Sequence, residues 1–223
     1  MSLNVLILAP HPDDEVLGCG GIIARYASAG ARVHVLVITR GIPEIFPPEQ
    51  IEETRRELAQ AHELLGVCET RFLDFPAPRL DTIPHHQVAD ALRREVVRIR
   101  PDVMYIPHSG DIHADHKIVH HAAMVAARPR PPFTVKKVLS YETLSETDWA
   151  LPVSSDAFMP NVFVDISAHL DRKLQALACY QSQILHGPPA RAPENVEALA
   201  RLRGSTIGVH AAEAFMLMRE IVD

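Results

Sequence analysis

The chain has 223 residues, of which 47% are hydrophobic and 22% charged, and its formal net charge is −6. This length and apolar content are ample for one packed core and slightly short for two, so we expect a single domain over residues 1–223. The negative charge excludes nucleic acid as the main partner, because a phosphate backbone needs a basic face.

Strand-like and helix-like patterns alternate along the first two thirds of the chain. Apolar runs typical of buried strands occupy residues 3–8, 32–38, 70–75, 102–106 and 136–141. Helical patterns lie between them, over residues 16–30, 49–66, 85–99 and 115–127. The alternation predicts an α/β fold with a Rossmann-like, mostly parallel sheet and helices on both faces.

The last third of the chain is less regular. Residues 142–160 show no periodic pattern, and residues 162–166 resemble a further strand. Ser167 is expected to cap a helix that runs to about Gln183, followed by a Gly/Pro linker over 185–193 and a last helix over 194–204. The apolar run 214–218 near the end could pair or pack between subunits of a homo-oligomer.

Cysteine usage and the first apolar run bear on the cellular compartment. That run is only as long as a strand and ends in His and Asp, which argues against a signal peptide or membrane insertion. Cys19, Cys68 and Cys179 are odd in number and form no CxxC pair. We expect buried, reduced cysteines that are neither disulfides nor metal ligands, and a cytoplasmic protein.

The turn after the first strand concentrates charge. His11, Asp13, Asp14 and Glu15 lie between the strand and the first helix. In open α/β sheets, ligands bind at the carboxyl ends of the strands. Adjacent carboxylates repel each other, and a divalent cation is the simplest reason to place them together.

A second cluster, Asp111-Ile112-His113-Ala114-Asp115-His116, follows the fourth strand in the same way. The two loops can face one crevice if their strands are neighbours. Imidazole and carboxylate ligands suit Zn²⁺, with Fe²⁺ or another first-row metal also possible. Spacing alone offers five candidate ligands and does not say which three would bind: His11, Asp13, Asp14, His113 and His116.

Plainer interpretations exist for each motif taken singly. A lone His-Pro-Asp is usually a turn, and Asp115 could simply cap the helix that follows it. A rival hypothesis uses Gly18-Cys19-Gly20-Gly21 as a phosphate-binding loop, but these glycines do not follow the strand directly and lie behind three carboxylates. Small residues that let the helix approach the sheet closely are the better explanation.

At Pro10-His11-Pro12-Asp13-Asp14-Glu15 and His113-Ala114-Asp115-His116, the chain resembles the PIG-L/LmbE family of zinc-dependent N-acetylglucosaminyl deacetylases. Further similarities follow in order along the chain: Thr39-Arg40-Gly41, Arg55-Arg56-Glu57, Tyr180-Gln181-Ser182-Gln183 and Ala212-Glu213-Ala214-Phe215. The similarity spans essentially the whole sequence. It implies a small-molecule amino-sugar substrate whose acetyl group is removed by hydrolysis.

The resemblance also implies a division of roles within the site. His11, Asp14 and His116 would hold zinc, and Asp13 would be the general base that takes a proton from the zinc-bound water. His113 would stabilise the oxyanion or protonate the leaving amine, and Asp115 would orient a histidine. Three further residues would face the substrate crevice: Arg55, Tyr141 and Glu142.

Two departures from the family pattern concern the substrate. Family members often carry Tyr where this chain has Ala211, and residues 142–160 match no family pattern. An amidase that uses the same mechanism on another acylated amine, such as a pseudo-disaccharide, a thiol conjugate or a natural product, is therefore an alternative. A metal-binding module without turnover is a second alternative, from a different class.

Overall fold

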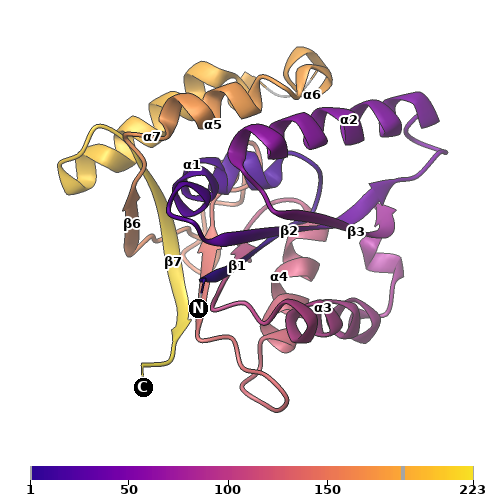
Figure 1. The fold of residues 1–223 in the computed structure, drawn as a ribbon. Helices are drawn as coiled ribbons and strands as arrows, with labels where there is room; N and C mark the ends of the chain where they lie inside the picture. Colours follow the sequence, from indigo (N-terminus) through magenta and orange to yellow (C-terminus); the bar gives the residue numbers. More distant parts are fainter. Residues whose placement is uncertain (1, 187–188, 223) are drawn as a thin grey trace.

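The computed structural model describes residues 2–186 and 189–222. Within these ranges the strands form one seven-stranded sheet in the order β3-β2-β1-β4-β5-β7-β6 (Figure 1). The first five strands are parallel, and β7 is antiparallel to both β5 and β6, so the predicted α/β fold with a mostly parallel sheet is confirmed. The strands are β1 (Asn4–Ala9), β2 (Arg32–Gly41), β3 (Glu69–Ala77), β4 (Val103–Pro107), β5 (Lys137–Tyr141), β6 (Val162–Asp165) and β7 (Ala212–Glu220).

Helices cover both faces of this sheet (Figure 1). One layer contains α1 (Asp14–Ser28), α2 (Pro48–Leu65), α5 (Leu170–Leu177), α6 (Gln181–His186) and α7 (Pro193–Ile207). The other contains α3 (His85–Ile99) and α4 (Ala114–Ala126), and short 3₁₀ turns lie at η1 (Leu80–Thr82) and η2 (Pro189–Arg191). None of the helices in the described ranges combines the length and the apolar content needed to cross a bilayer.

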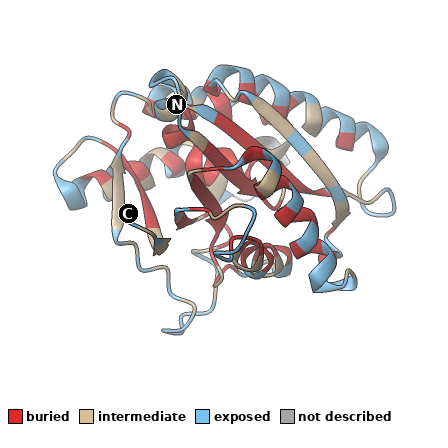
Figure 2. Cartoon of the chain, turned by 60° about the horizontal axis from the view of Figure 1, so that its bottom comes forward, coloured by how far each residue is buried: buried red, intermediate tan, exposed pale blue. Residues whose placement is uncertain are grey.

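Both faces of the central strands are buried, which explains their continuous apolar sequences (Figure 2). Successive side chains of a strand point to opposite faces. Val5 and Ile7 pack in the core beneath α1, whereas Leu6 and Leu8 pack in the second core beneath α3 and α4. Alternate side chains of β1 therefore belong to the two cores on opposite faces of the sheet.

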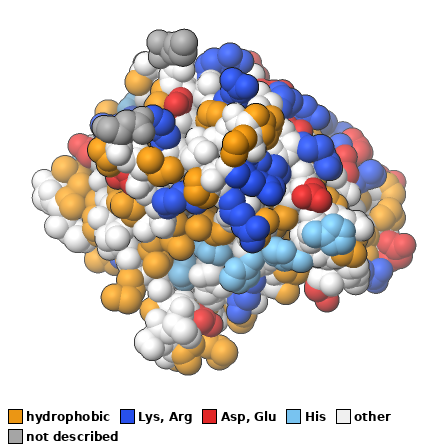
Figure 3. Space-filling model, turned by 90° about the horizontal axis from the view of Figure 1, so that it is seen from below, with side chains coloured by type: hydrophobic (Ala, Val, Ile, Leu, Met, Phe, Trp, Pro, Cys, Tyr) orange, Lys and Arg blue, Asp and Glu red, His pale blue; other side chains and the backbone are white. Residues whose placement is uncertain are grey.

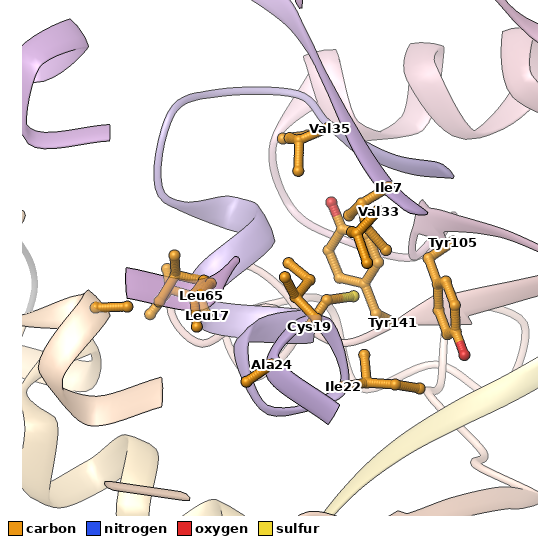
Figure 4. Close-up of a cluster of buried hydrophobic side chains, with 14 of the residues drawn as sticks. Ile7, Leu17, Cys19, Ile22, Ala24, Val33, Val35, Leu65, Tyr105 and Tyr141 are labelled. Atoms are coloured by element: carbon orange, nitrogen blue, oxygen red, sulfur yellow. The ribbon is translucent and has the colours of Figure 1, made fainter. Parts of the chain in front are cut away.

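Helix α1 packs very close to β5, in the core cluster that contains Cys19 and Tyr141 (Figure 4). A Cβ atom on Gly18 would lie 2.2 Å from Cδ2 of the Tyr141 ring. The interpretation of these glycines as close-packing residues is therefore confirmed. The cysteine prediction is right for burial at Cys19 only: all three cysteines are free, but Cys68 is exposed and Cys179 is half-buried.

The helix expected from Ser167 to about Gln183 is wrong. The Ser167 hydroxyl instead donates to Asp165 Oδ1 at 2.6 Å, and α5 begins only at Leu170. The chain leaves the helix after Leu177 and resumes it at Gln181. Tyr180 lies in this break, and its hydroxyl donates to the buried Glu15 Oε1 at 2.6 Å.

The apolar run 214–218 belongs to β7, in the interior of the sheet. β5 pairs with it from Phe215 onward and β6 pairs with it up to Phe215, so the run is a strand of this chain's own sheet, and its packing between subunits stays a prediction. The predicted linker over 185–193 includes residues 187 and 188, which lie outside the described residues. Of the rest, α6 extends to His186 and η2 covers Pro189–Arg191.

Candidate active site

Neighbouring strands bring the two predicted charged loops together. β1 pairs directly with β4 in parallel, so the loops that follow them leave the same edge of the sheet. The first loop leads into α1 and the second into α4. The rings of His11, His113 and His116 form a triangle, with the His11 centroid 4.5 Å from His113 and 5.2 Å from His116, and these two 5.6 Å apart.

His11, Asp14 and His116 converge on one point. Asp14 Oδ2 lies 3.3 Å from His11 Nδ1 and 3.2 Å from His116 Nε2. One ligand atom from each of the three residues lies within 4.8 Å of the other two. His11 also forms a second group of possible ligands with His113 and Asp115.

Two atoms of the first group are buried and make no hydrogen bond of good geometry: Asp14 Oδ1, and His116 Nε2, which lies 3.2 Å from Asp14 Oδ2. Buried polar atoms are nearly always paired, so these two atoms require an explanation. A cation would satisfy both of them. Two imidazole nitrogens and a carboxylate oxygen form a donor set that suits catalytic zinc, which takes three protein ligands and keeps one position open.

In His11 and His116, the ring nitrogen that does not face Asp14 contacts a second carboxylate. Asp115 Oδ2 lies 3.2 Å from His11 Nε2, and Asp111 Oδ2 lies 2.8 Å from His116 Nδ1. Such contacts fix the ring orientation and raise the basicity of a ligating imidazole. Asp115 thus bonds a histidine as the resemblance implied, whereas no role was assigned to Asp111 although it opens the second motif.

The protonation of the group follows from burial and charge. Burial would lower the pKa of His11, but hydrogen bonds to Asp115 and Asp14 outweigh it and raise that pKa to about 9. Burial would also lower the pKa of His116, but the negative charge of Asp14 outweighs it and raises that pKa to about 10. For Asp14, burial is outweighed by His116 and His11, which hold its pKa well below the usual value. A bound cation would take the place of the imidazole protons.

Asp13 has an unusual backbone conformation. Its φ of 105° and ψ of −27° place a non-glycine residue in the left-handed region, at a cost of about 1–3 kcal/mol. Its N–H donates to Glu15 Oε2 at 3.2 Å, and its Oδ2 accepts a hydrogen bond from Arg191 at 2.8 Å. The other oxygen, Oδ1, is buried and has no partner. Burial, opposed by Arg191 and reinforced by the charge of Asp14, raises the Asp13 pKa to about 7.

His113 caps the start of α4. Its Nδ1 accepts a hydrogen bond from the Asp115 N–H at 3.1 Å. Burial and then the neighbouring histidines lower the His113 pKa to about 4, so the ring is neutral at pH 7. Because Nδ1 acts as the acceptor, the proton of the neutral ring is on Nε2. His113 therefore offers a hydrogen-bond donor.

A cavity of about 240 Å³ opens over these residues. Phe46, Ile51 and Phe72 supply apolar surface, and the polar side chains include Gln50 and Thr54. On the face of the molecule in Figure 3, histidines gather beside lysine and arginine side chains. Three arginines belong to the lining of the cavity: Arg40, Arg55 and Arg191.

Of the three expected substrate contacts, only Arg55 lies in the cavity wall. It pairs with Asp74, and its guanidinium lies 4.4 Å from the centre of the Phe72 ring. The other two expectations are corrected by the structure. Tyr141 is fully buried and donates to Leu8 O at 2.7 Å, and Glu142 binds Arg203 through two hydrogen bonds of 2.8 and 2.6 Å.

Two cavity residues were missed by sequence reasoning. Arg191 donates to Asp13 Oδ2 at 2.8 Å, to Glu146 Oε1 at 3.0 Å and to Ser145 Oγ at 2.8 Å. Glu146 lies in the segment without periodic pattern and Arg191 in the predicted linker. Neither position carries a local signal, because each reaches the site only through tertiary packing.

Comparison with known proteins gives consistent matches. Residues 6–127, which include both charged motifs, match the family model described as PIG-L, GlcNAc-PI de-N-acetylase. The chain is 33% identical over 188 residues to the uncharacterized deacetylase YaiS of Escherichia coli K12, covering 80% of this chain and 91% of that protein.

Two further similarities span most of the chain. The 1D-myo-inositol 2-acetamido-2-deoxy-alpha-D-glucopyranoside deacetylase of Saccharomonospora viridis is 29% identical over 239 residues, covering 86% of this chain and 89% of that protein. The crystal structure of a conserved protein from Thermus thermophilus superimposes with a TM-score of 0.79 at 32% identity, covering 99% of this chain and 97% of that one.

Proposed function

The chain belongs to the PIG-L family, and from this membership we propose that it is a zinc-dependent hydrolase that removes the acetyl group from an N-acetylglucosamine-type sugar or conjugate. One observation supports the proposal most strongly. Asp13 Oδ1, Asp14 Oδ1 and His116 Nε2 are buried and make no hydrogen bond of good geometry, and His11 and Asp13 of the same cluster line the cavity. Among the relatives, the S. viridis protein is named for a 2-acetamido-sugar substrate.

Three residues would hold the metal: His11, Asp14 and His116. When bound there, zinc would polarise the amide carbonyl and lower the pKa of a water molecule. Asp115 and Asp111 orient the two imidazoles from behind. This arrangement leaves the Asp13 carboxylate outside the ligand group and free for proton transfer.

Asp13 would act as the general base. Arg191 holds its Oδ2, so the unpaired Oδ1 is the atom that takes a proton from the attacking water. Burial raises the pKa of the Asp13 carboxyl, which makes its carboxylate a stronger proton acceptor than an exposed one. The same proton can then pass to the leaving amine nitrogen as the carbon–nitrogen bond breaks, giving acetate and a free amine.

His113 would stabilise the negative charge that develops on the carbonyl oxygen. Its Nε2–H is available because Nδ1 is engaged by the Asp115 backbone. A preorganised donor of this kind contributes most where water is excluded. The cavity supplies such surroundings, with Phe72 and Arg55 on its wall to contact the sugar or its attached group.

Replacement of Asp13 tests the proposal. Asp13→Asn should retain one zinc per chain but lower kcat by about 10²–10⁴-fold, because the base is lost while the metal ligands remain. Metal content and amine release from N-acetylglucosamine and its glycosides measure the two effects. Asp81→Asn, at an exposed position, is the matched control and should behave like the wild type.

The outcomes separate the alternatives. Wild-type kcat in Asp13→Asn would contradict the assigned base. Amine release from other acetamides but not from acetamido sugars would keep the mechanism and reject the substrate class. Stoichiometric zinc without amine release from any amide would indicate a binding module instead.

A further inference from the structure

A buried carboxylate lies directly behind the Asp13 turn. Glu15 is fully buried, and its Oε2 accepts the Asp13 N–H at 3.2 Å. Its Oε1 accepts a hydrogen bond of 2.6 Å from the Tyr180 hydroxyl, and His62 Nε2 lies 3.2 Å from the same oxygen. Because Oε1 is the acceptor for Tyr180, we assign Nε2 of His62 as a second donor to the same oxygen.

His62 is itself held from its other side. Its Nδ1 lies 2.6 Å from the Thr70 hydroxyl, which completes the hydrogen bonding of the ring. His62 belongs to α2 and Thr70 to β3, whereas Tyr180 lies in the break between α5 and α6. The carboxylate thus connects the first loop to three other parts of the fold.

Packing alone does not explain this carboxylate. Within the described ranges, no lysine or arginine forms an ion pair or hydrogen bond with Glu15, and its carboxylate contacts the Asp13 N–H, the Tyr180 hydroxyl and the His62 ring. Burial of a charged group is costly, and apolar side chains of similar volume would fill such a space without that cost. The arrangement therefore calls for a role beyond filling the core.

The hydrogen bond between Glu15 and the Asp13 backbone indicates the role of this carboxylate. The Asp13 backbone lies in the left-handed region, with φ of 105°, where a non-glycine residue persists only when its surroundings hold it. Glu15 binds the N–H of that residue. We propose that Glu15, Tyr180 and His62 form a positioning frame, the Glu15 frame, that holds Asp13 in the conformation directing Oδ1 toward the reacting water.

This inference rests on the proposed function of Asp13. Tyr180, which supplies one of the hydrogen bonds of the frame, lies in the break before α6. Tyr180 and His62 are absent from the cavity wall and would act through Asp13 as positioning residues. A small displacement of a catalytic group can cost a large factor in rate without affecting substrate binding.

Kinetics of zinc-loaded variants test the frame. Tyr180→Phe and His62→Leu should each lower kcat about 10-fold or more while KM stays within about twofold, because the base is misplaced and the cavity wall is unchanged. His62→Gln should restore most of the rate, since its amide can replace the Nε2–H donor. Zinc content should remain at the wild-type level in all three.

Tyr105→Phe is the matched control. Tyr105 is buried in the same core cluster as Tyr180. Its hydroxyl forms a hydrogen bond of 3.1 Å with the Tyr26 hydroxyl, which is not part of the Glu15 frame. It should lose stability without losing kcat. If Tyr180→Phe and His62→Leu also keep the wild-type kcat and lose only stability, the frame is structural and the proposal is overturned.

Hydrogen–deuterium exchange of the backbone amides of His11 and of residues 13–17 gives a readout independent of turnover. The Asp13 amide should exchange faster in Tyr180→Phe than in Tyr105→Phe. A wild-type enzyme that hydrolyses no amide would reject the proposed function, and the exchange result would still test the frame. Equal exchange in the two variants would overturn the frame even if the hydrolase activity were established.

Discussion

Asp111 shows how a residue that is not a metal ligand can control one. It lies 2.8 Å from the far nitrogen of His116 and accepts a hydrogen bond of 2.6 Å from Thr147. Asp111→Asn should lower zinc affinity about 10–100-fold, because the imidazole loses the carboxylate that fixes its tautomer and orientation. Competition with a chelator of known affinity measures this change.

The control for Asp111 is Asp171→Asn, the same substitution at an exposed position of α5. It should leave zinc affinity unchanged. Wild-type affinity in the Asp111 variant would show that His116 does not depend on this contact, and would weaken its assignment as a ligand.

Adjacent residues of the first motif have different roles because of the backbone. Asp13 and Asp14 are chemically identical and consecutive, so spacing alone left both as candidate ligands. The left-handed conformation at Asp13 separates them: Asp14 Oδ2 faces His11 and His116, whereas Asp13 Oδ2 faces Arg191. A conformation of this kind depends on contacts from distant elements and has no local sequence signal.

At the level of elements, α1 and β5 pack too closely to admit a side chain at Gly18. A methyl group on Gly18 would meet the Tyr141 ring at 2.2 Å, and that ring is fixed by its hydrogen bond to Leu8 O. Gly18→Ala should therefore lower the free energy of unfolding by at least about 1–3 kcal/mol through overpacking. Urea denaturation followed by circular dichroism measures the loss.

Ser28→Ala, at the exposed end of the same helix, is the control and should change stability by less than about 0.5 kcal/mol. If Gly18→Ala were as stable as the control, α1 would be able to move away from β5. The small residues of this helix would then need another explanation.

Elements with strong local patterns were predicted well. The helix over residues 85–99 has the predicted bounds, because its apolar positions recur with helical spacing and bury one face. The helix expected over 167–183 is interrupted: Ser167 bonds Asp165 ahead of α5, and Tyr180, in the break before α6, bonds Glu15. Tertiary contacts override local propensity at such positions.

For the whole molecule, metal binding should couple to stability. A ligand that binds only the folded chain stabilises it by about 2.7 kcal/mol at 100 times Kd, so zinc at that excess should raise Tm by roughly 5–10 °C. Scanning calorimetry with chelator-treated protein, with and without zinc, measures the shift. His11→Ala should abolish it.

His86→Ala, at an exposed position in the first turn of α3, should keep the full zinc-dependent shift. A shift that persists in His11→Ala would place the bound cation elsewhere. Loss of the shift in His86→Ala as well would show that the shift depends on this exposed histidine, and would contradict the assignment of the metal to His11, Asp14 and His116.

The sequence by itself determined the layered α/β fold and the edge of the sheet that carries the site, because both follow from local patterns of burial and from charged residues at strand ends. Only the tertiary structure decided that β7 enters the sheet between β5 and β6, that Tyr141 is a core residue and that Arg191 meets Asp13. Asp13 and Arg191 are 178 positions apart. Contacts over such separations depend on how helices and strands pack together, which no local pattern encodes.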